Sequence, residues 1–277
     1  MKRTMSVPHK PGAPTLELSD VWVGYGGRLS SGNGGTRHAL ENITFRVERG
    51  ERVAVVGPNG AGKSTLFKVI AGTLRPDSGR VDIYGHGPAG HICIAYVPQR
   101  NQVDWSFPVT VEDVVMMGRV GQIGLLRRPG KSGWATVHMA LERVGATDLT
   151  HNQIGELSGG QQQRVFLARA LAQQAELVLM DEPLNGLDIP TQEAIISILD
   201  DLRRDGVTVL LATHDLDLAA ERFDRIMLLN RHIVAFDRPE ETLQADNLLR
   251  AYGGHLHRVG DDGALLVADT CCDGEQN

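Results

Sequence analysis

The sequence predicts an α/β fold in which a mainly parallel sheet is covered by helices on both faces. Three continuous apolar runs, at residues 53–56, 177–180 and 207–211, are typical of strands that are buried on both sides. Between the second and third runs, residues 189–204 place apolar side chains at helical spacing along one face. Buried strands that alternate with amphipathic helices indicate a parallel sheet. The length of 277 residues allows one large domain or two smaller ones.

The first part of the chain predicts a disordered lead-in followed by two strands. Residues 1–14 contain three prolines and several basic side chains without apolar periodicity, and they lack the apolar core of a secretory signal. Residues 15–25 and 43–47 alternate apolar with polar side chains, which predicts strands with one buried face. Between them, the Gly- and Ser-rich residues 26–35 predict a flexible loop.

A phosphate-binding pattern, G-x-x-x-x-G-K-[ST], directly follows the buried strand at 53–56 and precedes an apolar helix. Its glycines let backbone N–H groups surround a nucleotide phosphate, and the helix N-terminus favours negative charge. We expect Lys63 to contact the β- and γ-phosphates and Ser64 to bind Mg²⁺. The alternative is a chance glycine-rich turn, which the flanking strand and helix disfavour. The residues of this phosphate loop are Gly57, Pro58, Asn59, Gly60, Ala61, Gly62, Lys63, Ser64 and Thr65.

Residues 100–170 predict a helical subdomain inserted into the α/β core, because they contain no convincing buried strand. Within it, Ser158 and Gln161 precede an apolar helix and form a capping box in sequence. A cap alone does not need the two glycines between them, Gly159 and Gly160, which weaken a first helical turn. They indicate close approach of a ligand phosphate to the helix end. Since the phosphate loop already serves the chain's own nucleotide, this second helix end suggests a site completed by another subunit.

Two carboxylates, Asp181 and Glu182, end the predicted strand at 177–180. Neighbouring residues of a strand point to opposite faces, so we expect different roles for them. Asp181 is placed to bind Mg²⁺ beside the phosphate loop, and Glu182 to orient or deprotonate the water that attacks the γ-phosphate. The alternative is a solvated acidic strand end.

The remaining elements follow the same α/β pattern. Asp188 is a candidate N-cap of the helix at 189–204, with Pro190 in the first turn. The strand at 207–211 leads to His214 and then to Asp215, a candidate cap for the next helix. Residues 260–277 are rich in acidic and small side chains, a composition that predicts a loose tail.

Composition excludes several classes of protein. The formal net charge of −6 disfavours nucleic acid as the main partner. No uninterrupted apolar run approaches the roughly 18–20 residues that span a bilayer. Cys93, Cys271 and Cys272 are too few for a disulfide framework. The spacing of His255, His257, Cys271 and Cys272 matches no structural zinc site. We therefore expect a globular protein of the cytoplasm.

The sequence Leu-Ser-Gly-Gly-Gln at 157–161 lies between the phosphate loop and the carboxylates, and with it the chain resembles the nucleotide-binding subunits of ABC transporters over residues 15–254. This resemblance implies a P-loop NTPase core with an antiparallel β subdomain, a helical subdomain at about 100–170 and a tail at 255–277. It also implies a head-to-tail homodimer with two ATP molecules, each held between one phosphate loop and the partner's 157–161 segment. The motifs occur in the family's order: Tyr25, residues 57–65, Gln99, residues 157–161, Asp181 with Glu182, residues 185–188, and His214.

By the same resemblance, Tyr25 stacks on adenine and Gln99 links Mg²⁺ to the transport subunit. His214 lies near the γ-phosphate, and Asp188 crosses the dimer interface. Taken singly, Tyr25 could be a strand-end aromatic and Gln99 a turn residue. Two features depart from the family's pattern: the loop at 26–35 lengthens the connection after Tyr25, and Asn185 replaces the commoner Ser or Thr.

The amino-acid sequence of residues 96–119 resembles that of the manganese, zinc and iron importers of this family. Such an importer has separate permease subunits in the membrane and an extracytoplasmic substrate-binding protein, and its ATPase lies on the cytoplasmic face. Other substrates (an iron chelate, cobalamin or an exported molecule) and a non-transport ABC ATPase remain alternatives. A module without hydrolysis is disfavoured, because Lys63, Asp181, Glu182 and His214 are all present.

Overall fold

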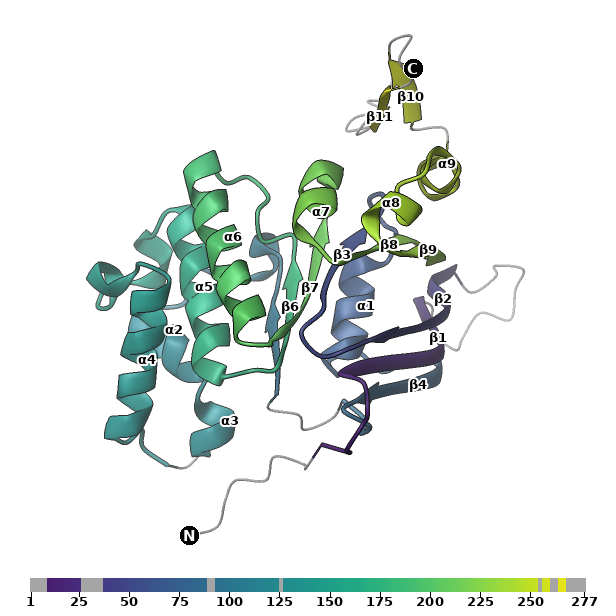
Figure 1. Cartoon of the computed structure of the whole chain (residues 1–277). Helices are drawn as coiled ribbons and strands as arrows, with labels where there is room; N and C mark the ends of the chain where they lie inside the picture. Colours follow the sequence, from purple (N-terminus) through teal and green to yellow (C-terminus); the bar gives the residue numbers. More distant parts are fainter. Residues whose placement is uncertain are drawn as a thin grey trace.

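The computed structural model describes residues 9–25, 37–88, 93–124, 127–253, 256–259 and 264–267 (Figure 1). Its centre is a six-stranded sheet in the order β5-β6-β7-β3-β8-β9, in which all neighbours except β8 and β9 are parallel. The predicted α/β class with a mainly parallel sheet is therefore confirmed. The strands are β3 (Arg52–Val56), β5 (Ile94–Val97), β6 (Leu177–Asp181), β7 (Thr208–Thr213), β8 (Arg225–Asn230) and β9 (His232–Asp237).

Alternate side chains of each central strand pack into different cores, because both faces of the sheet are covered. In β3, Val53 and Val55 belong to one apolar cluster, and Ala54 and Val56 belong to the other. Helix α1 (Lys63–Ile70) lies on the first face, between the central sheet and a second sheet (Figure 1).

The second sheet is antiparallel, with the order β2-β1-β4. It consists of β1 (Leu16–Tyr25), β2 (Arg37–Val47) and β4 (Ser78–Ile83). Register shifts along β1 break the strict alternation of its apolar residues, but Leu16, Leu18, Val21 and Val23 all belong to the apolar cluster that contains α1. This sheet is the antiparallel β subdomain that the resemblance implied.

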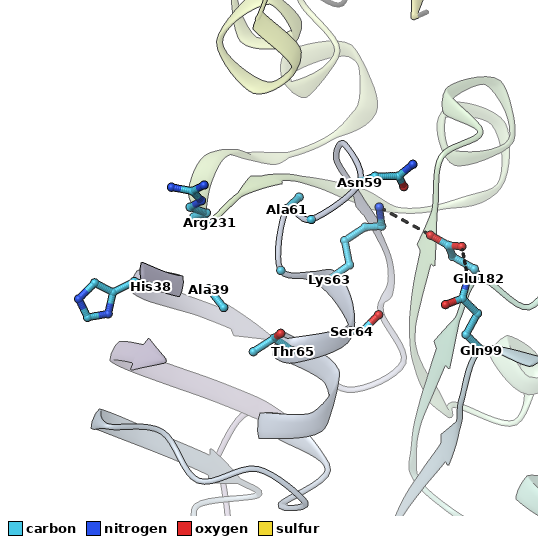
Figure 2. A pocket seen from close by; sticks show the side chains of 12 residues that line it. His38, Ala39, Asn59, Ala61, Lys63, Ser64, Thr65, Gln99, Glu182 and Arg231 are labelled. Carbon is cyan, nitrogen blue, oxygen red and sulfur yellow. Dashed lines mark hydrogen bonds and ion pairs between the residues drawn. The ribbon is translucent and has the colours of Figure 1, made fainter. Parts of the chain in front are cut away.

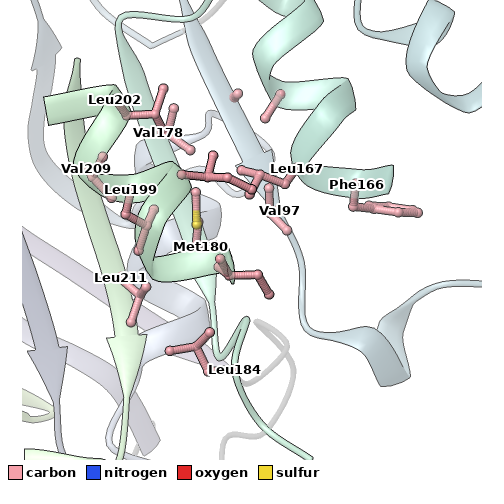
Figure 3. Packing of buried hydrophobic residues seen from close by; sticks show 14 of the residues in the cluster. Val97, Phe166, Leu167, Val178, Met180, Leu184, Leu199, Leu202, Val209 and Leu211 are labelled. Atoms are coloured by element: carbon pink, nitrogen blue, oxygen red, sulfur yellow. The ribbon is translucent and has the colours of Figure 1, made fainter. Parts of the chain in front are cut away.

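Between β5 and β6 the described chain is helical, apart from one isolated bridge between Thr110 and Gln153. The helices are α2 (Val111–Met117), α3 (Val120–Ile123), α4 (Lys131–Arg143) and α5 (Gly159–Gln173). Figure 3 shows Leu167 of α5 beside Val178 and Met180 of β6, with Leu199 and Leu202 of α6 (Ile189–Arg204) on the other side. The helical block thus shares one apolar core with the second face of the central sheet.

The C-terminal part differs from the expected loose tail. After α7 (Leu216–Arg222), α8 (Pro239–Thr242) and α9 (Ala245–Tyr252), strand β10 (Leu256–Val259) pairs with β11 (Ala264–Val267) as an antiparallel hairpin. The residues of β11 are aliphatic and favour strands, which the acidic and small residues around them had hidden in the composition. The expected loop at 26–35 and most of the lead-in lie outside the described residues. Within the described chain, no helix has the length and apolar character needed to cross a bilayer.

Candidate functional site

The phosphate loop joins β3 to α1 at the carboxyl end of the sheet, and its glycines are enforced by close backbone contacts. A Cβ atom on Gly57 would lie 2.0 Å from the Leu229 carbonyl oxygen, and one on Gly62 would lie 2.6 Å from that of Ala39. Gly62 also caps α1 in the left-handed region, with φ of 101°. The loop is therefore fixed between β8 and β2, with the N-terminus of α1 facing a pocket.

This pocket has a volume of about 490 Å³, which suits a ligand of nucleotide size (Figure 2). It combines residues of the phosphate loop with side chains from β2, from the end of β5, from the end of β6 and from the β8–β9 turn. The lining residues are His38, Ala39, Asn59, Gly60, Ala61, Gly62, Lys63, Ser64, Thr65, Gln99, Glu182 and Arg231.

Three predicted site residues converge at one end of the pocket. The Lys63 ammonium donates to the Gly57 carbonyl oxygen at 2.7 Å and lies 3.7 Å from Glu182 Oε1. Gln99 Nε2 donates to Glu182 Oε2 at 2.8 Å (Figure 2). Glu182 has a left-handed backbone with φ of 50°, a conformation that is unfavourable for a non-glycine residue and is typical of functional sites. The end of β6 is therefore held in a strained geometry that directs this carboxylate to the phosphate loop.

Asp181 occupies a different environment from Glu182. Its side chain is buried, the Tyr96 hydroxyl donates to Oδ2 at 3.4 Å, and Oδ1 has no hydrogen-bond partner among the described residues. Burial raises the pKa of the Asp181 carboxyl; Glu182 raises it too, whereas the hydrogen bond with Ser64 lowers it. A buried carboxylate oxygen without a partner, beside a hydroxyl, fits the oxygen ligands that Mg²⁺ prefers.

The segment 157–161 forms the predicted cap at the start of α5. Ser158 N donates to Gln161 Oε1 at 2.8 Å, and Gln161 N donates back to Ser158 Oγ at 3.4 Å, so the capping box is confirmed. None of these residues lines the nucleotide-sized pocket of the same chain. The structure also gives the two glycines a reason that the sequence did not reveal. A Cβ on Gly159 would lie 2.7 Å from Arg100 Nη1, and one on Gly160 would lie 2.8 Å from Thr191 Cγ2.

The remaining predicted residues lie around this centre. His214 is exposed and lines a separate pocket of about 100 Å³, which shares Glu182 with the larger pocket. Asp215 caps α7 as predicted, accepting from Leu218 N at 2.9 Å. Asp188 is the N-cap of α6 as predicted, with extended backbone and Pro190 in the first turn, but its exposed side chain makes no capping hydrogen bond.

At the other end of the pocket, strand pairing places the Tyr25 backbone beside the entrance. Tyr25 pairs with Arg37, and the preceding Gly24 pairs with His38, which lines the pocket. The Tyr25 side chain lies outside the described part of the structure. His38, Ala39 and Arg231 were missed by sequence reasoning, because no motif contains them.

Arg231 reaches the pocket through backbone contacts that only the folded chain creates. Its N–H donates to the Ala61 carbonyl oxygen at 2.8 Å, and its own carbonyl oxygen accepts from Glu41 N at 2.8 Å. Its backbone is left-handed, with φ of 60°. In Figure 2 its side chain lies on the opposite side of the phosphate loop from Glu182.

Comparison with known proteins matches residues 40–185 to the ABC transporter family. The manganese transport system ATP-binding protein MntA of Synechocystis sp. is 49% identical over 245 residues, which cover 87% of this chain and 93% of the relative. The zinc transport system ATP-binding protein TroB of Treponema pallidum is 47% identical over 218 residues, or 78% and 82% of the two chains. Among solved structures, the dimeric post-hydrolysis state of the ATP-binding cassette MJ0796 with ADP and Pi has a TM-score of 0.71 and 27% identity, covering 81% of this chain and 98% of that one.

Proposed function

Since the chain belongs to the ABC transporter family as an ATP-binding subunit that hydrolyses ATP, we propose that it powers import of a transition-metal ion through a separate membrane permease. The observation that carries the proposed chemistry is the convergence of Lys63, Gln99 and Glu182 at one end of the phosphate-loop pocket. We propose manganese, zinc or iron as the transported ion from the sequence of residues 96–119 and from the transport systems to which the relatives belong.

The proposed binding mode places the phosphates of ATP along the phosphate loop, with the γ-phosphate nearest Glu182. Lys63 then exchanges its contact with Gly57 for the β- and γ-phosphates, which leaves the Glu182 carboxylate facing the attacking water. The adenine lies at the opposite end, against Tyr25, where His38 borders the pocket.

The proposed Mg²⁺ ligands are Ser64, Asp181 and Gln99, and the partnerless oxygen of Asp181 supports this assignment. Bound there, Mg²⁺ would neutralise charge on the β- and γ-phosphates. Glu182 lines both pockets, and His214 lines the smaller of the two beside it. We assign to Glu182 the role of base or water-orienting group, and to His214 a contact with the γ-phosphate.

A head-to-tail homodimer completes each site in this proposal. The phosphate-binding end of α5, with Ser158, Gly159, Gly160 and Gln161, lies outside the chain's own pocket and so is available to the partner's ATP. Asp188 is exposed where the dimer interface would pass. The permease holds the dimer at the cytoplasmic face of the membrane, and an extracytoplasmic protein delivers the metal.

The test of this function is the substitution Glu182→Gln, which keeps the shape of the side chain and removes the base. We expect the rate of ATP hydrolysis to fall by about 10²–10⁴-fold, ATP affinity to be retained, and a dimer to accumulate when ATP is added. Turnover is measured by phosphate release and dimerisation by analytical ultracentrifugation. The exposed Glu240→Gln is the matched control.

Hydrolysis at the wild-type rate by the Glu182→Gln protein would remove Glu182 from this role. Transport is tested separately, by reconstituting the ATPase with its permease in vesicles and comparing uptake of Mn²⁺, Zn²⁺ and Fe²⁺. Absence of ATP-dependent uptake of all three ions would overturn the proposed cargo while leaving the ATPase assignment intact.

A further inference from the structure

Arg100 directly follows Gln99 and has been given no role above, yet its side chain contacts the start of α5. Its Nε donates to Gln162 Oε1 at 3.0 Å. The Gln162 amide is itself buried and fixed, since its Nε2 donates to the Ile154 carbonyl oxygen at 3.2 Å. The guanidinium is therefore bound to a rigid acceptor on the first turn of α5.

The same guanidinium lies against the backbone of Gly159. A Cβ atom on Gly159 would be 2.7 Å from Arg100 Nη1 and 2.9 Å from Cζ, distances that are too short for stable contact. An alanine at this position would force the Arg100 guanidinium to shift away from the start of α5. The absence of a side chain at Gly159 thus lets the guanidinium lie close to this helix end.

The backbone of Arg100 is also attached to α5. Trp105 Nε1 donates to the Arg100 carbonyl oxygen at 2.9 Å, and the Trp105 ring packs edge-on against Phe166 of α5. Immediately before Arg100, Gln99 donates to the Glu182 carboxylate at 2.8 Å. Two consecutive residues therefore contact the proposed catalytic carboxylate of one site and the helix end proposed for the other.

We propose that Arg100 is a positioning residue that sets the N-terminus of α5 for the ATP of the partner subunit, and that it couples this helix end to the state of Gln99 and Glu182. The inference rests on the proposed head-to-tail dimer. Arg100 does not line the pocket of its own chain, so binding of ATP to a single subunit should not depend on it. Assembly of the ATP-bound dimer and turnover should depend on it.

The branched guanidinium is needed for this role, because Nε donates to Gln162 while Nη1 and Cζ lie close to Gly159. A lysine keeps the charge but cannot make this pair of contacts. The variants Arg100→Lys and Arg100→Gln therefore separate positioning from a general effect of charge. The exposed Arg128→Lys serves as the control for a surface arginine.

The experiment measures three quantities for each variant: the Kd for ATP at low protein concentration, the dimer dissociation constant with ATP in the Glu182→Gln background, and kcat in the Glu182-containing protein. For both Arg100 variants we expect an unchanged Kd for ATP. We expect the dimer dissociation constant to rise and kcat to fall by about 10- to 100-fold, the effect of losing one hydrogen bond to a charged group. Dimerisation and turnover at wild-type levels in both variants, or full restoration by Arg100→Lys, would overturn the inference.

A double-mutant cycle provides the second test. Gly159→Ala and Arg100→Ala remove the same contact from its two sides, so their effects on dimerisation should not add, and the double variant should be close to the worse single one. Fully additive effects would contradict a direct coupling of these residues. Failure of the Arg100-containing Glu182→Gln protein to dimerise with ATP would instead overturn the proposed dimer, and this inference with it.

Discussion

Replacing Asp181 with Asn tests whether this buried carboxylate serves the nucleotide site at the expense of stability. Asp181 is 1% exposed, its Oδ1 has no hydrogen-bond partner within the described chain, and burial raises its pKa. An unsatisfied buried group costs about 1–3 kcal/mol, and more when it is charged. Asn keeps an acceptor oxygen for the Tyr96 hydroxyl and places an amide group at the other oxygen, so the expected gain comes from removing the buried charge. We therefore expect the nucleotide-free variant to be about 1 kcal/mol more stable, which raises Tm by roughly 2–4 °C.

Binding of nucleotide should reverse this order. A non-hydrolysable ATP analogue with Mg²⁺, at a hundred times its Kd, stabilises the wild-type protein by about 2.7 kcal/mol. If loss of the carboxylate weakens binding about a hundredfold, the same concentration only equals the Kd of the variant, and its gain is about 0.4 kcal/mol. The wild-type protein then becomes the more stable one by about 1 kcal/mol, after the advantage of the variant is subtracted.

The assay is scanning calorimetry of both proteins without nucleotide, with the analogue and Mg²⁺, and with the analogue and EDTA. The EDTA arm controls for contacts that do not involve the metal, and there we expect the Asp181→Asn protein to remain the more stable one. Equal stabilisation of both proteins by the analogue with Mg²⁺ would refute the assignment of Asp181 as a ligand. A less stable nucleotide-free variant would refute the argument from burial.

Three further predictions concern single side chains. Lys63→Ala should raise the Kd for ATP at least tenfold in isothermal titration, because it removes the charge beside the β- and γ-phosphates; an unchanged Kd would contradict the phosphate-loop assignment. Arg231→Ala should weaken ATP and ADP equally, because this side chain lies away from Glu182; selective loss of ATP would place it near the γ-phosphate instead. Burial raises the pKa of the Cys93 thiol to about 11. At pH 8, iodoacetamide should therefore alkylate Cys93 about a hundredfold more slowly in the folded than in the unfolded protein, and the free energy of unfolding should fall as the pH rises above the usual pKa of a thiol. Equally fast alkylation of the folded and unfolded protein would show that the thiol is not shielded.

Elements with a strong local pattern could be predicted from the sequence. Helix α6 has the predicted bounds, and the strands before the phosphate loop and before Asp181 lie where the apolar runs placed them. The Ser158 capping box was also predictable, since it depends only on residues three positions apart. Such features are fixed by short-range contacts and by burial of both faces of the sheet.

Features that depend on distant contacts could not be predicted. Arg231 enters the pocket because its turn is hydrogen-bonded to Ala61 and Glu41, which lie far from it in the sequence. The hairpin of β10 and β11 depends on pairing that a short apolar run does not specify. Asp188 is the N-cap of α6 as its sequence position predicted, but the absence of a side-chain capping hydrogen bond could not be predicted from the sequence.

Gly159 and Gly160 show how a correct sequence pattern can carry an incomplete physical explanation. From the sequence, two glycines in a helical first turn indicated close approach of a ligand. In the folded chain, side-chain atoms of Arg100 and Thr191 lie 2.7 and 2.8 Å from the positions where the Cβ atoms of Gly159 and Gly160 would be. Cβ leaves the backbone in one direction, whereas the amide N–H groups of a first turn point along the helix axis. The contacts with Arg100 and Thr191 and the proposed contact with the partner's phosphate therefore act on different sides of the same residues, and an alanine at either position is expected to move a neighbouring side chain as well as the backbone.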